Sequence, residues 1–132
     1  MSINVTVLRE QCSLTVWSGD EGKCQVCDNV IVDVRRTVYC SKKCSIWWER
    51  NHVWRKARAN ARRKGKYACS VCGETKATTK IEVDHRQPIN GVNYNIPSCI
   101  HHEDNLQVLC KKHHNEKSSL EASLRAESRR QA

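Results

Sequence analysis

The sequence has little of the material from which large apolar cores are built. Its 132 residues include no phenylalanine and one methionine, and 39% of them are hydrophobic. A chain this short buries a modest share of its surface, so it needs another source of stability. The first ten residues have neither a basic start nor an apolar run, so we expect no secretory signal peptide. No stretch approaches the about 20 apolar residues of a membrane helix, so we expect a soluble protein.

Cysteine, by contrast, is abundant, with nine residues. In an intracellular protein, cysteine pairs indicate zinc rather than disulfides. Cys24 and Cys27 form one close pair, and Cys40 and Cys44 form another. Four thiolates in two pairs suit tetrahedral zinc, although four ordinary buried cysteines are the alternative. We expect residues 1–44 to be an N-terminal strand region followed by a zinc finger, with residues 3–7 alternating like a strand.

A second tetrahedral set is predicted from Cys69, Cys72, Cys110 and His113. His114 follows His113 directly, and neighbours on a helix point about 100° apart. One histidine can therefore bind zinc while the other faces elsewhere. The spacing from Cys110 favours His113 as the zinc ligand, and the reverse assignment is the alternative.

Positive charge is concentrated in one segment. The formal charge is +9, from 23 Lys and Arg against 14 Asp and Glu. The segment from residue 45 to residue 66 has neither Pro nor Gly before Gly65, so we expect one basic helix that ends there. A run so one-sided favours a polyanionic partner, double-stranded DNA, over a merely solvated face. The expected DNA contacts are Arg50, Arg55, Lys56, Arg58, Arg62, Arg63, Lys64 and Lys66.

Three short motifs follow the Cys69 and Cys72 pair. They are Val83-Asp84-His85, then Asp104-Asn105-Leu106, then Leu109-Cys110 with His113-His114 and Lys117. In these motifs, residues 67–120 resemble the HNH nuclease family. The resemblance implies a two-stranded ribbon and a helix around a divalent metal. The expected fold is therefore a small α+β zinc-stabilised protein: zinc finger, basic linker helix and C-terminal ββα-metal nuclease module. We expect a strand over residues 80–83, a last helix opened near Asp104 by Asn105, and a polar tail at residues 121–132.

The resemblance also implies roles for single residues. Asp84 and His114 would hold one catalytic Mg²⁺ or Mn²⁺, in addition to two structural Zn²⁺ ions. His85 would act as general base, because neutral imidazole accepts a proton near physiological pH. Asn105 would orient His85 or its loop, or else approach the metal. Ser118 stands where some members have a third histidine, so two protein ligands are expected.

Several residues remain outside these sets. We expect His52 to be a phosphate contact or a surface residue, and His101 and His102 to be surface or helix-start residues, with phosphate contact as their alternative. Cys12 and Cys99 are expected to be free thiols, with Cys99 as a reserve metal ligand. Lys117 would touch phosphate or cap its helix.

The sequence thus predicts a metal-dependent endonuclease that hydrolyses double-stranded DNA. By its resemblance it would be a homing or phage-encoded enzyme, site-selective or nicking, in the cytoplasm of a bacterial or phage-infected cell. We expect a monomer, with a dimer as the alternative. One other hypothesis is a non-catalytic zinc-finger DNA-binding protein; against it, both zinc sets are complete without Asp84, His85 or His114. Another is an HNH nuclease of broad or RNA specificity.

Overall fold

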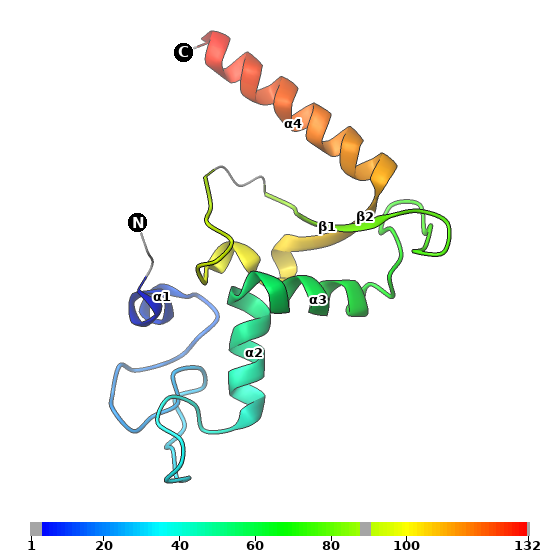
Figure 1. The fold of residues 1–132 in the computed structure, drawn as a ribbon. Coiled ribbons are helices and arrows are strands. Elements are labelled where there is room, and N and C mark those ends of the chain that lie inside the picture. Colours follow the sequence, from blue (N-terminus) through cyan, green and yellow to red (C-terminus); the bar gives the residue numbers. More distant parts are fainter. Residues whose placement is uncertain (1–3, 88–90, 132) are drawn as a thin grey trace. The chain divides into compact units, whose positions relative to one another are not determined.

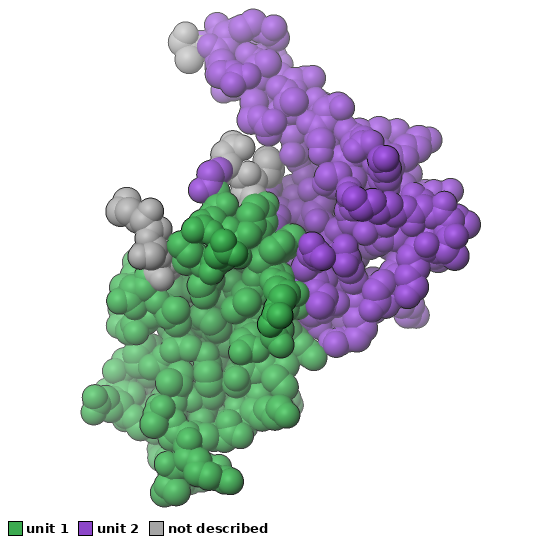
Figure 2. Space-filling model, in the orientation of Figure 1, with its two compact units in different colours: residues 1–57, 92–103 green, residues 58–91, 104–132 purple. Residues whose placement is uncertain are grey.

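The computed structural model describes residues 4–87 and 91–131, and the chain divides into two compact units. Residues 1–57 and 92–103 form the first unit, and residues 58–91 and 104–132 form the second (Figures 1 and 2). The segment 92–103 thus belongs to the first unit although it lies in the sequence between the two strands of the second. Within the described ranges, no helix has the length and apolar character needed to cross a membrane.

The N-terminal segment is a helix, so the predicted strand is wrong. Helix α1 spans Val5–Gln11, and Leu8 is buried; Ile3 lies outside the described residues. Asn4 caps the helix, because its Oδ1 accepts a hydrogen bond from the Thr6 backbone at 2.9 Å. A strand needs a partner for its backbone groups, whereas a capped helix satisfies most of them locally. Alternation of Val and Thr alone did not reveal this.

The basic segment forms two helices rather than the single one predicted. Helix α2 spans Lys42–His52 and helix α3 spans Trp54–Lys64, with Val53 between them at φ −100° and ψ 115°. The His52 carbonyl accepts a hydrogen bond from the Ser98 backbone at 2.9 Å instead of continuing the helical ladder. The break therefore depends on a residue distant in sequence. The predicted end before Gly65 is confirmed.

The second unit contains a two-stranded sheet followed by a helix. Strand β1 (Ile81–His85) pairs antiparallel with β2 (Leu106–Cys110), in a register that sets Asp84 opposite Gln107. Helix α4 (Lys111–Gln131) follows β2 directly and contacts both strands (Figure 1). The predicted strand at residues 80–83 is confirmed, although it begins one residue later and ends two residues later. The helix start near Asp104 is wrong, because a 3₁₀ turn at Glu103–Asn105 and then β2 occupy that stretch.

The core of the second unit is small. Among the described residues, its buried apolar cluster comprises Cys69, Ile81, Val108, Leu109 and Cys110. Gly65 approaches this core closely: a Cβ there would fall 2.9 Å from Val108 Cγ2. The protein is thus a small α+β protein with little apolar material, as the composition predicts.

Candidate active site and metal centres

The first cysteine group is assembled around the start of α2. The sulfur atoms of Cys24, Cys27, Cys40 and Cys44 all lie within 4.8 Å of one another. Cys27 Sγ is 3.5 Å from Cys40 Sγ, which is 3.7 Å from Cys44 Sγ. These distances approach the edge of about 3.8 Å that four sulfurs around one zinc ion would have. The group could hold a metal ion.

The thiols of this group differ in acidity. Burial raises the pKa of Cys24, but hydrogen bonds from the backbone of Cys27, Cys40 and Val26 bring it to about 7. Burial, followed by the neighbouring Cys40, raises the pKa of Cys44 to about 12. The backbone is therefore arranged to stabilise a first thiolate. Binding a cation is the ordinary way to deprotonate the others.

The second group lies in the second unit and contains Cys69, Cys72, Cys110 and His113, again within 4.8 Å. His113 Nδ1 is 3.1 Å from Cys110 Sγ and 3.6 Å from Cys69 Sγ. Burial raises the pKa of Cys69, but hydrogen bonds from the backbone of Cys110, Cys72 and Val71 lower it to about 6. The structure thus places His113, and not His114, against the cysteines.

His114 faces two carboxylates of β1 instead. Glu82 and Asp84 are two positions apart on the strand, so their side chains share one face. His114 Nδ1 lies 2.9 Å from Glu82 Oε2, and its Nε2 lies 3.7 Å from Asp84 Oδ1. Sequence reasoning brought Asp84 and His114 together but missed Glu82. The alternation of side chains along a strand was the signal that could have found it.

The second oxygen of Asp84 is already engaged. Asp84 Oδ2 accepts hydrogen bonds from Lys117 Nζ at 2.9 Å and from Gln107 Nε2 at 3.2 Å. Lys117 also donates to the His85 carbonyl at 3.0 Å and pairs with Glu121. Burial opposes its charge, but the bonds to Glu121 and Asp84 raise the pKa of Lys117. A fixed ammonium therefore borders the site.

His85 is buried at the end of β1, with 6% of its surface exposed. Burial lowers its pKa, and Lys117 adds to this effect while Asp84 opposes it. Asn105 holds the backbone of the two residues that follow His85. The Asn105 Oδ1 accepts from the Gln87 backbone at 3.1 Å, and the Asn105 carbonyl accepts from the Arg86 backbone at 2.7 Å.

The basic residues expected to contact DNA are distributed over more than one element. Arg50 lies on α2, Lys66 follows α3, and the other six lie on α3. Arg50 and Arg62 are partly buried, and the exposed Arg63 donates to Asn60 at 2.7 Å. The exposed members are Arg55, Lys56, Arg58, Arg63, Lys64 and Lys66.

Two of the histidines expected at the surface are buried. His52 and His101 each have 0% of their surface exposed, so a surface position for them is wrong. The His52 ring packs 4.5 Å from the Trp48 ring, and the His101 ring packs 5.2 Å from that of Trp54. In a chain without phenylalanine, these imidazoles serve as aromatic packing partners, which composition could have suggested.

The chain is a small α+β protein with a two-stranded antiparallel sheet and Cys/His groups that could hold metal ions. The chain is 36% identical over 72 residues to a protein of Lactococcus phage SK1 named "Probable HNH endonuclease". The alignment covers 54% of this chain and 76% of the phage protein. The chain belongs to the HNH endonuclease family. Neither a family model nor a solved structure matches it.

Proposed function

We propose that this protein is a metal-dependent endonuclease that hydrolyses phosphodiester bonds in double-stranded DNA. The observation that carries the proposal is the convergence of Asp84 and His114, from β1 and α4, at the end of the strand that carries His85. Membership of the HNH endonuclease family supports the reaction class.

The donor set fits one hard divalent ion. Asp84 Oδ1 and His114 Nε2 are 3.7 Å apart, a separation that two ligands at about 2.1 Å from one ion can span. Asp84 Oδ2 is held by Lys117 and Gln107, which leaves Oδ1 for the ion. Two protein ligands leave room for water and phosphate, which suits Mg²⁺ or Mn²⁺. When bound, the ion would supply Lewis-acid stabilisation of the charge that develops on phosphate.

Glu82 is placed to position His114 rather than to react. An imidazole whose Nδ1–H is donated to a carboxylate presents the lone pair of Nε2, and that nitrogen faces Asp84. Carboxylates commonly orient metal-binding histidines in this way. Glu82 is thus a positioning residue for His114.

His85 would accept the proton of the attacking water. Its buried setting favours the neutral imidazole that a base requires. Asn105 would keep His85 oriented by holding the backbone of the next two residues. Lys117 would add positive charge beside the phosphate that is cut.

The Cys24 and Cys69 groups would each hold a structural zinc ion that stabilises its unit. We assign residues 1–44 to a zinc finger, residues 45–66 to DNA contact, residues 67–120 to the nuclease core and residues 121–132 to a polar tail. Within this scheme the exposed basic residues of α3 bind the phosphate backbone. A homing or phage-encoded role, and action as a nicking monomer, complete the proposal.

The test is incubation of zinc-loaded protein with supercoiled plasmid and with RNA of matched length, in Mg²⁺ or Mn²⁺ and in EDTA. Metal-dependent conversion of plasmid to open circles supports the proposal. A linear product formed directly would support hydrolysis of DNA but contradict a nicking monomer, because it requires paired active sites. Cutting of RNA alone would contradict the choice of substrate. DNA binding without any cutting, on plasmids of several sequences, would favour a non-catalytic zinc-finger protein.

A further inference from the structure

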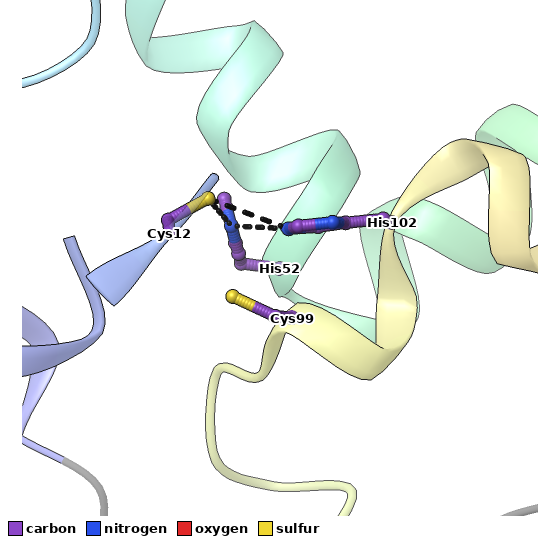
Figure 3. A group of neighbouring side chains, drawn as sticks. All are labelled: Cys12, His52, Cys99 and His102. Atoms are coloured by element: carbon purple, nitrogen blue, oxygen red, sulfur yellow. Dashed lines mark hydrogen bonds between the residues drawn. The ribbon is translucent and has the colours of Figure 1, made fainter. Parts of the chain in front are cut away.

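Four residues that neither cysteine group nor the candidate active site uses come together in the first unit. They are Cys12, His52, Cys99 and His102 (Figure 3). Cys12 follows α1, and His52 ends α2. Cys99 begins the 3₁₀ turn Cys99–His101, and His102 follows that turn. Figure 3 shows the four side chains pointing toward one another. Their ligand atoms all lie within 4.8 Å of one another.

We propose that this group binds a third structural zinc ion through two thiolates and two imidazoles. Cys12 Sγ lies 3.3 Å from His52 Nε2 and 3.5 Å from His102 Nε2, and the two nitrogens are 3.0 Å apart. A tetrahedral zinc ion would set such atoms roughly 3.3 to 3.6 Å apart. The corresponding distances in the Cys69 group run from 3.1 to 3.9 Å. The ligand atoms of the two groups are therefore spaced alike.

One imidazole is already oriented for a metal. His52 Nδ1 lies 2.8 Å from the Trp48 carbonyl oxygen, which can only accept, so Nδ1 carries the proton. The lone pair of His52 is consequently on Nε2, the atom that faces the group. A hydrogen bond from the other ring nitrogen to a backbone carbonyl is typical of metal-binding histidines.

Burial and charge favour the same conclusion. His52 is fully buried and Cys12 is 4% exposed. Burying polar groups is costly unless each has a partner, and one ion would engage all four. Two thiolates and two neutral imidazoles around Zn²⁺ carry no net charge, so this ligand set suits a buried position better than four thiolates do.

The cysteine count gives independent support. The three groups contain four, three and two cysteines, and together they take up all nine in the chain. Cys12 and Cys99, which the sequence left as free thiols, would thereby gain a function.

The site would join segments that are far apart in the sequence. Cys12 is 40 residues from His52 and 90 residues from His102. Beside the site, Ser98 donates to the His52 carbonyl at 2.9 Å and Glu103 donates to Asn51 Oδ1 at 3.0 Å. The ion would thus fasten segment 92–103, which lies between β1 and β2 in the sequence, to α1 and α2 of the first unit. Closing such long loops with a metal constrains the unfolded chain strongly.

The test is zinc content per chain after gel filtration, measured in a His114→Ala background so that the candidate catalytic site contributes none. Three zinc ions per chain are expected, and Cys12→Ser should reduce the number to two. His101→Phe is the matched control, because His101 adjoins His102 but lies outside the group; it should retain three. Two ions in the His114→Ala protein, or an unchanged number in Cys12→Ser, would overturn the proposal.

A second pair of measurements keeps the test decisive if Cys12→Ser does not fold. His102→Cys replaces one zinc ligand by another and should retain three ions. Cys99 is half-buried, so its reaction with a thiol-specific reagent is compared before and after the zinc is chelated. No rapid thiol reaction is expected before the zinc is chelated, and prompt modification of Cys99 in zinc-loaded protein would overturn the proposal. None of these measurements depends on nuclease activity.

Discussion

At the centre of the candidate active site, His114 faces two carboxylates to which we assign different roles. Asp84 offers an oxygen beside Nε2, and Glu82 accepts at Nδ1. Experiment can distinguish a metal ligand from a residue that orients a ligand. Loss of the orienting residue should lower metal affinity more than it affects the reaction itself.

Glu82→Ala should raise the Mg²⁺ or Mn²⁺ concentration for half-maximal cleavage by about tenfold to a hundredfold. For Glu82→Gln this metal concentration should lie between those of the unaltered protein and Glu82→Ala, because the amide oxygen still accepts a hydrogen bond from Nδ1. Glu116→Ala, an exposed residue of α4, is the control. Metal titrations of the cleavage rate measure the effect. An unchanged titration curve for Glu82→Ala would remove the positioning role.

A second prediction concerns the close approach of Gly65 to Val108. Gly65→Ala should destabilise the protein by about 1–3 kcal/mol, because the new Cβ would lie 2.9 Å from Val108 Cγ2. Val108→Ala should relieve the contact, so the double variant should lose less stability than the two single variants together. Urea unfolding followed by circular dichroism measures this. Additive losses would show that the backbone accommodates the methyl group without strain.

At the scale of elements, α3 carries most of the proposed DNA contacts. Replacing the exposed Arg55, Lys56 and Arg58 by Gln should weaken binding about equally for all sequences. The slope of log affinity against log salt should fall by about 0.9 for each phosphate that the variant no longer neutralises. Arg35→Gln, an exposed arginine paired with Asp33, is the control for loss of charge. If the salt slope of the triple variant is unchanged, these three residues do not contact phosphate, and the DNA-binding surface lies elsewhere.

The elements also show where sequence reasoning succeeded and where it stopped. The Cys24 and Cys69 groups, β1 and the end of α3 were predictable, because residue spacing, an apolar run and a glycine determine them locally. The break at Val53 was not, since it depends on Ser98 taking the His52 carbonyl. Likewise β2 falls where the sequence predicts a helix, because Leu106–Cys110 becomes a strand through its pairing with β1.

The candidate site divides in the same way. Asp84, His85, Asn105 and His114 were predicted from the resemblance to HNH motifs, each of which is a short local pattern. Glu82 was missed, although the alternation of side chains along β1 places it on the same face as Asp84. The Cys12 group required contacts across as many as 90 residues, which no local pattern encodes.

At the scale of the whole molecule, metal should contribute much of the stability. The core cluster of the second unit holds five residues, and two of them are cysteines of the Cys69 group. Stripping tightly bound zinc with a strong chelator should therefore unfold the protein, and zinc, unlike Mg²⁺, should restore it. Near-ultraviolet circular dichroism of the tryptophans would report both changes. A native spectrum in protein shown to be zinc-free would contradict the metal-stabilised fold.

The central claim is that β1 and α4 form a hydrolytic site with His85 as its base, and single-turnover cleavage by His85→Ala tests it most directly. The rate should fall by about a hundredfold to ten-thousandfold, while zinc content and DNA affinity stay those of the unaltered protein. His101→Phe should cut at the original rate. If His85→Ala cuts as fast as the unaltered protein under the same metal, the assignment of His85 and the mechanism built on it are wrong.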